Sequence, residues 1–141
     1  MRGGVDNKSA EGVIKSYVTA QMTADLDAVM DCLYFEDESA KEEAREFLEG
    51  IMSGVKVTGT VNGFKIEVTK EYSEDEVKAY AETADITATV TAVKELSVTY
   101  SYDLKATMTV DGSETSMEQK GTEENEPFTV FEIDGKWYVQ A

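Results

Sequence analysis

Histidine is absent from the 141 residues of this chain, and cysteine and arginine are nearly so. Without histidine the chain supports no Ser-His-Asp or Cys-His mechanism and almost no kind of zinc site. The single cysteine, Cys32, excludes an intramolecular disulfide. Its neighbours Asp27 and Asp31 oppose a reactive thiolate, so we expect a buried structural cysteine. The two arginines, Arg2 and Arg45, leave little scope for bidentate phosphate recognition.

Positive charge is also scarce. Thirteen Lys and Arg residues face 29 Asp and Glu residues, which gives a formal net charge of -16. This field repels nucleic acid and anionic lipid, so we expect neither as a partner. No apolar run approaches the roughly 20 residues that a membrane span needs, and the first residues lack the apolar core of a signal peptide.

Acidic residues gather in three runs, at residues 36–38, 74–76 and 123–126. Carboxylates suit calcium, but none of the runs has the alternating ligand spacing of a calcium loop. We therefore expect solvated surface acid, no metal site and no cofactor. Weak calcium binding or contact with a basic protein surface is the open alternative.

The first third of the chain predicts three helices, because apolar residues recur there at intervals of three and four. Ser9 is the expected N-cap of the first helix, over residues 9–23, and Asp25 that of the second. Ser39 and Glu42 match a capping box that opens a third helix, and Gly54 is placed to end it. The residues expected to face the core are Val13, Ile14, Tyr17, Val18, Met22, Leu26, Val29, Met30, Leu33, Ala44, Phe47, Leu48, Ile51 and Met52.

From residue 55 onward the apolar period changes to two, which predicts strands. Asn62-Gly63 is a strong hairpin signal, and Asp111-Gly112 and Asp134-Gly135 predict two further turns. A turn near Lys94-Glu95 and a charged loop over residues 120–126 complete the expected breaks. The expected strands cover residues 55–61, 64–72, 86–92, 96–110, 114–122, 128–133 and 137–139.

Helices followed by strands predict an α+β domain, with three N-terminal helices packed on the concave face of a curved antiparallel sheet of six or seven strands. The strand over residues 96–110 would extend about 50 Å and must bend. Size argues for a single domain over residues 9–141, after a flexible tether over residues 1–8. The outer face is rich in threonine, which indicates either simple strand propensity or a homodimer through the sheet. These threonines are Thr87, Thr89, Thr91, Thr99, Thr107 and Thr109.

Two short segments carry a family resemblance. Residues 19–29 (TAQMTADLDAV) and residues 131–139 (FEIDGKWYV) resemble a helix junction and the closing hairpin of the nuclear transport factor 2-like superfamily, the SnoaL-like, cystatin-related cone. Within it the chain looks most like small bacterial extracytoplasmic proteins, often lipoproteins. The resemblance implies a cone-shaped fold and a location at a bacterial cell surface, with the cytoplasm as the alternative. It assigns no activity, because the superfamily contains isomerases, dehydratases, hydrolases and binding modules.

A curved sheet backed by helices has room for a pocket between the layers, so a small apolar ligand is the first functional hypothesis. Tyrosine hydroxyls and adaptable methionines would line such a pocket, and ordinary core packing is the alternative. The candidate ligand-binding residues are Tyr17, Met30, Tyr34, Tyr100, Tyr102 and Met108.

We therefore predict a non-catalytic binding or interaction domain, for a small apolar ligand or for a protein with a basic surface. The alternative is a pocket enzyme, isomerase-like or dehydratase-like, that uses Tyr and Asp for proton transfer. Tyr17 lies where ketosteroid isomerases of similar fold place a tyrosine. The inward face of residues 96–110 carries no acid, however, and Asp85 and Asp103 face the other way, so we assign no catalytic residue. A purely structural dimer is the third hypothesis.

Overall fold

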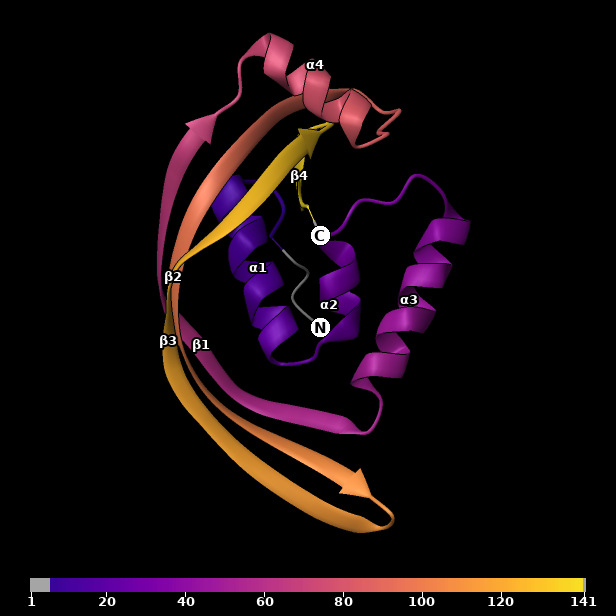
Figure 1. The fold of residues 1–141 in the computed structure, drawn as a ribbon, viewed down its shortest axis with the longest axis vertical. Helices are drawn as coiled ribbons and strands as arrows, with labels where there is room; N and C mark the ends of the chain where they lie inside the picture. Colours follow the sequence, from indigo (N-terminus) through magenta and orange to yellow (C-terminus); the bar gives the residue numbers. More distant parts are fainter. Residues whose placement is uncertain (1–5, 141) are drawn as a thin grey trace.

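In a computed structural model, which describes residues 6–140, a four-stranded antiparallel sheet curves around the helices on its concave side (Figure 1). The elements are α1 (Ala10–Met22), α2 (Leu26–Asp31), α3 (Glu38–Met52), β1 (Val55–Glu71), α4 (Glu74–Thr83), β2 (Val90–Val110), β3 (Ser113–Ile133) and β4 (Lys136–Val139). The α+β class is confirmed, but the expected sheet of six or seven strands is wrong. The sheet has four strands in the order β1-β2-β3-β4.

At three positions where the sequence predicts a turn or loop between strands, the strand continues. At Asn62-Gly63, strand β1 continues along β2 through a bulge in which Gly63 has φ +68°. At Lys94-Glu95, strand β2 runs straight on, paired with β1 on one side and β3 on the other. The expected charged loop over residues 120–126 belongs to β3, where Asn125 (φ 53°) lies at a second irregularity and its N–H donates to the Thr99 hydroxyl at 3.0 Å.

The two Asp-Gly turns are confirmed. Asp111 and Gly112 have φ values of 51° and 78°, and Asp134 and Gly135 have 53° and 77°. Positive φ at both central residues matches the twist of antiparallel strands, so each pair closes a tight hairpin. These turns join β2 to β3 and β3 to β4.

The predicted N-caps of the first two helices are confirmed, and the predicted start of the third helix is wrong. The side chains of Ser9 and Asp25 accept N–H groups in the first turns of α1 and α2. Helix α3 begins earlier than expected, because Asp37 is its N-cap and accepts a first-turn N–H at 2.8 Å. Aspartate caps as well as serine does, so the expected capping box of Ser39 and Glu42 is not used.

Helix α4 lies in a stretch for which no helix was expected. Its N-terminus carries a capping box, in which Ser73 and Glu76 each accept the other's backbone N–H. Val77 is buried, and the ring of Tyr80 lies 5.8 Å from that of Phe131. Helix α4 thereby covers one end of the concave face.

Helix α1 fills the middle of the concave face. Its Val13 and Ile14 are fully buried, as are Leu96 and Val98 of β2, which belong to the same apolar cluster. Trp137 and Val139 of β4 complete this cluster. The space between sheet and helices is therefore packed with side chains.

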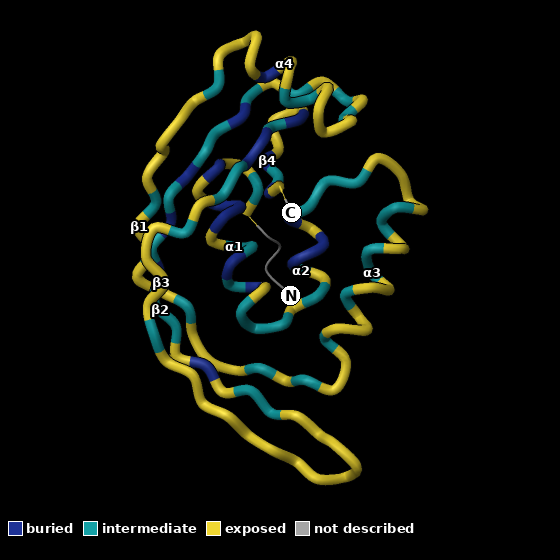
Figure 2. Tube along the Cα trace, viewed as in Figure 1, coloured by how far each residue is buried: buried dark blue, intermediate teal, exposed yellow. Residues whose placement is uncertain are grey.

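Helix α3 is the exception among the helices, because none of its residues is buried (Figure 2). Phe47 is 69% exposed and Ile51 is 59% exposed, so the expectation that this apolar stripe faces the core is wrong. Helices α1 and α2 already occupy the concave side. Helix α3 stands outside them, tied to α2 by an ion pair of 2.8 Å between Arg45 and Asp27.

Candidate functional site

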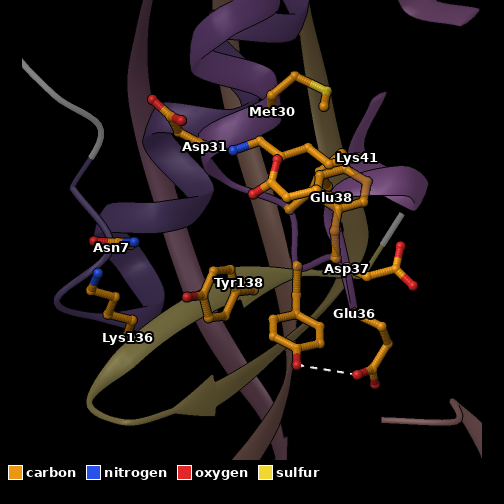
Figure 3. A pocket seen from close by; sticks show the side chains of 12 residues that line it. Asn7, Met30, Asp31, Glu36, Asp37, Glu38, Lys41, Lys136 and Tyr138 are labelled. Atoms are coloured by element: carbon orange, nitrogen blue, oxygen red, sulfur yellow. Dashed lines mark hydrogen bonds between the residues drawn. The ribbon is translucent and has the colours of Figure 1, made fainter. Parts of the chain in front are cut away.

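A cavity lies outside the sheet's core, between α2, the start of α3 and β4 (Figure 3). It is an open cleft of about 660 Å³. Its lining combines apolar and aromatic side chains with carboxylates and two lysines, and Figure 3 shows these lysines on different sides of the cleft. The lining residues are Asn7, Met30, Asp31, Leu33, Tyr34, Phe35, Glu36, Asp37, Glu38, Lys41, Lys136 and Tyr138.

Two tyrosines from distant parts of the chain meet in this cleft. The rings of Tyr34 and Tyr138 lie 5.5 Å apart in an edge-to-face arrangement. Both also contact the buried ring of Phe131, at 6.2 Å and 5.9 Å. This packing fixes the aromatic wall, because edge-to-face pairs hold a preferred geometry.

The carboxylate of Glu36 is held by three hydrogen bonds. It accepts from the N–H and from the hydroxyl of Thr87, both at 2.7 Å, and from the hydroxyl of Tyr34 at 3.4 Å. The bonds from Thr87 lower the pKa of Glu36, so this carboxylate stays ionised at neutral pH. Partial burial, together with the nearby Glu36, raises the pKa of Tyr34, which therefore stays protonated.

The six residues expected to share one pocket are spread over the molecule. Met30 and Tyr34 line the cleft, whereas Tyr17 lines a smaller hollow of about 360 Å³ beside Phe128. Tyr100 is buried in the core, Tyr102 is half-buried beside Gly121, and Met108 is 46% exposed at the far end of the sheet. The structure thus brings together two of the six.

Besides Tyr34 with Glu36, two tyrosine–carboxyl pairs bear on the enzyme alternative. The hydroxyl of Tyr72 donates to Glu95, which lines the hollow beside Tyr17, and this bond, followed by burial, raises the pKa of Tyr72 to about 12. The hydroxyl of Tyr100 donates to Glu126 Oε1 at 2.8 Å. Burial, followed by this bond, raises the pKa of Tyr100, which opposes a role as a strong acid or as a phenolate. Neither Tyr100 nor Glu126 lines the cleft or the hollow beside Tyr17.

The expected buried cysteine is confirmed. Cys32 is fully buried, and its thiol lies 3.9 Å from the carbonyl oxygen of Val13. Burial, and then the charge of Asp31, raises the pKa of Cys32 to about 12. The thiol is therefore uncharged and unreactive at neutral pH.

Much of the threonine-rich face is used within the chain. Four of its hydroxyls bond to neighbouring groups, those of Thr87, Thr91, Thr99 and Thr107. These bonds give four of the six threonines a partner within the chain, and Thr87 lies before β2 begins. A homodimer through this face remains a prediction.

Within residues 6–140, no group of three or more His, Cys, Asp or Glu side chains is arranged to hold a metal ion. In the same part of the chain, none of the helices has the length and apolarity needed to cross a membrane.

The sequence did not single out Tyr138, Lys41 or Lys136 as site residues. Tyr138 follows the buried Trp137 in β4, so strand alternation turns it outward into the cleft. The acidic run at residues 36–38 was expected to be plain surface acid. Its position directly after Tyr34-Phe35, between two helices, was the available signal.

No protein-family model matches this chain, and no curated protein matches it. A solved structure, the intermembrane space region of the chloroplast protein ARC6, is similar with a TM-score of 0.47 and 15% sequence identity. The alignment covers 100% of this chain and 95% of that one. Similarity at this level carries no argument about function.

Proposed function

We propose that this chain is a non-catalytic binding domain, whose cleft between α2, α3 and β4 takes a cationic side chain from a partner protein. The observation that carries the proposal is an aromatic wall, Tyr34 with Tyr138, beside a row of carboxylates. A Lys or Arg side chain combines an apolar stem with a charged head, so both parts of such a wall attract it.

The charges of the cleft favour a cation over an anion. Three consecutive carboxylates, at residues 36–38, line it against the ammonium groups of Lys41 and Lys136. The net charge of -16 on the whole chain adds long-range attraction for a basic partner. Arginine suits the site better than lysine, because its planar guanidinium stacks on aromatic rings and pairs with carboxylates in a fork.

A binding role is better supported than the enzyme alternative. In the cleft, the bonds from Thr87 lower the pKa of Glu36, and burial, followed by Glu36, raises the pKa of Tyr34, so the first is ionised and the second protonated at neutral pH. General acid–base catalysis needs a group whose pKa lies near the working pH. Neither member of this pair meets that need.

The family resemblance and the bacterial cell-surface location also remain proposals. Helices that precede a curved antiparallel sheet support the resemblance, and the small number of strands counts against it.

The test is an NMR titration of the ¹⁵N-labelled protein with the peptide Ac-Arg-Ala-Arg-NH2, with Ac-Gln-Ala-Gln-NH2 as the neutral probe. We expect saturable shifts at the cleft with the arginine peptide alone. The double variant Asp37→Asn/Glu38→Gln removes two charges and keeps a capping residue, and should weaken binding about fivefold.

The matched control is Glu123→Gln/Glu124→Gln, which removes the same charge from exposed positions on β3. Its affinity should change by less than about twofold. Shifts spread over the acidic surface, or equal losses from the two double variants, would show general charge attraction and overturn the proposal. An absence of shifts would overturn it as well.

A further inference from the structure

Large apolar side chains are exposed together at the end of the molecule opposite α4. Among the described residues, five of the exposed large apolar side chains lie on α3 or beside the β2–β3 turn, and a sixth, Val68, lies elsewhere on β1. We call these five the distal apolar surface: Phe47 (69% exposed), Ile51 (59%), Met108 (46%), Val110 (56%) and Met117 (57%).

The helical part of this surface is one stripe. Phe47 and Ile51 are four residues apart, so they lie one turn apart on the same face of α3. Helix α3 ends at Met52, and Ser53-Gly54 lead directly into β1. The stripe therefore reaches the start of the sheet.

The strand part continues the same surface. Val55 pairs with Met108, so the end of α3 joins β1 beside an exposed methionine. Met117 pairs with Ala106, on the same face as Met108. Strand alternation places this face in line with Leu104 and Tyr100, which are buried on the concave side. The face that α1 covers higher up is thus left open here (Figure 2).

The charges around this surface favour a partner with positive charge. Beyond its first turn, helix α3 carries four glutamates against Arg45, which is already paired with Asp27. Glu38 and Lys41 lie in the first turn and line the cleft instead. In this part of the sheet, Lys56 pairs with Thr107 and Lys105 with Thr58, so alternation turns both lysines to the convex face. Among the described residues of α3 and of this part of the sheet, the border of the apolar surface is therefore acidic.

A second copy would bring the same acidic border and a charge of -16, so like charges would meet. A basic amphipathic helix brings an apolar stripe for the surface and Lys or Arg for the border. Methionines such as Met108 and Met117 also suit this role, because their flexible side chains adapt to a docked helix. We propose that the distal apolar surface is a docking site for a basic amphipathic helix of a partner protein, separate from the cleft.

The probe is a synthetic 18-residue Leu–Lys peptide with Leu on one helical face, labelled for fluorescence anisotropy. A peptide of the same composition without the helical period is the reference. We expect the amphipathic peptide to bind at least tenfold more tightly and to gain helical circular dichroism on binding. Phe47→Gln and Met117→Gln should each weaken it about fivefold or more.

Val68→Gln is the matched control, since Val68 is equally apolar and 45% exposed but lies outside the surface. It should change the affinity by less than about twofold. The cleft variant Asp37→Asn/Glu38→Gln should also change it by less than about twofold, which separates this proposal from the previous one.

Three results would overturn the proposal. Equal binding of the reference peptide would mean charge attraction alone. Equal losses from Val68→Gln and Phe47→Gln would place binding elsewhere. A stable dimer in analytical ultracentrifugation that Phe47→Gln dissociates would make a second copy the occupant.

Discussion

The two ends of the sheet are built from the same strands and differ in what covers them. Along β2, Leu96 and Val98 are 1% and 0% exposed beneath α1, whereas Met108 and Val110 on the same face are 46% and 56% exposed. The alternation of apolar and polar residues is equally regular in both places. Alternation therefore predicts which residues share a face, and burial depends on whether another element lies over that face.

The helices explain the difference. Helix α4 covers one end with Val77, and α1 covers the middle with Val13 and Ile14. Helix α3 has an apolar stripe of its own but stands beside α2, away from the sheet. The uncovered end thus has two apolar faces that no described element buries.

The largest expected effect is on the free energy of unfolding, and it compares a buried side chain with an exposed one at the open end of the sheet. Ile14→Ala removes a fully buried side chain and should lower the free energy of unfolding by about 2–5 kcal/mol. Met108→Ala, at the open end, should change it by no more than about 0.5 kcal/mol. Urea unfolding followed by the fluorescence of the buried Trp137 measures both. Equal losses would mean that the open end is covered in solution.

A second effect is expected at Gly59, where the covered and open parts of the sheet meet opposite Leu104. Gly59 has φ +134°, and a Cβ there would overlap the backbone oxygen of Asp103. Gly59→Ala should therefore destabilise the fold by about 1–3 kcal/mol.

Gly50 in α3 is the control for that substitution, since a Cβ there meets nothing within 4 Å. Gly50→Ala should stabilise the protein by about 0.5–1 kcal/mol, because alanine favours a helix interior. Thermal and urea unfolding of both variants provide the comparison. A Gly59→Ala protein as stable as the wild type would contradict the close approach of the two strands.

The smallest effect concerns the covered end, where Lys70 bonds to Glu76 at 2.8 Å beside the cap of α4. This bond, and then the backbone N–H of Ser73, lowers the pKa of Glu76 from 4.5 to about 2. Because the pKa is lower in the folded state, ionised Glu76 stabilises the fold above about pH 4.5, and this contribution is lost as the pH falls through about 2.

Glu76→Gln should therefore lower the Tm slightly at pH 6, and its difference from the wild type should shrink towards pH 2. Glu74→Gln, in the same helical turn, is the control and should show no such convergence. A difference that is constant from pH 6 to pH 2 would contradict the assigned pairing.

Much of the fold could be predicted from local pattern. Ser9 and Asp25 cap the first two helices, and the two Asp-Gly turns close their hairpins, because each needs only its neighbours in sequence. Asn62-Gly63 has the same local signal as those turns but forms a bulge, since both flanking segments pair with β2. The bulge results from pairing with a strand that is distant in the sequence, and the two residues Asn62-Gly63 alone do not predict that pairing.

The candidate site was harder to predict for the same reason. Tyr34 and Tyr138 are 104 residues apart and meet only because β4 returns beside α2. Helix α4, by contrast, was within reach of local reasoning, since Ser73 and Glu76 have the spacing of a capping box. The exposure of α3 could not be predicted locally. Its apolar stripe has the regular spacing of a buried helix, and only the packing of the whole chain leaves that stripe uncovered.

The position of β4 sets the order in which the chain can complete its fold during synthesis. The N–H groups of Trp137 and Val139 donate to the carbonyl oxygens of Asn7 and Cys32, at 2.7 Å and 2.9 Å. At roughly 5–20 residues per second, a ribosome needs about 10 s to pass from Ile14 to Val139. Until then the apolar stripe of α1 lacks part of its final surroundings. The helix that is synthesised first is therefore among the last to be fully enclosed.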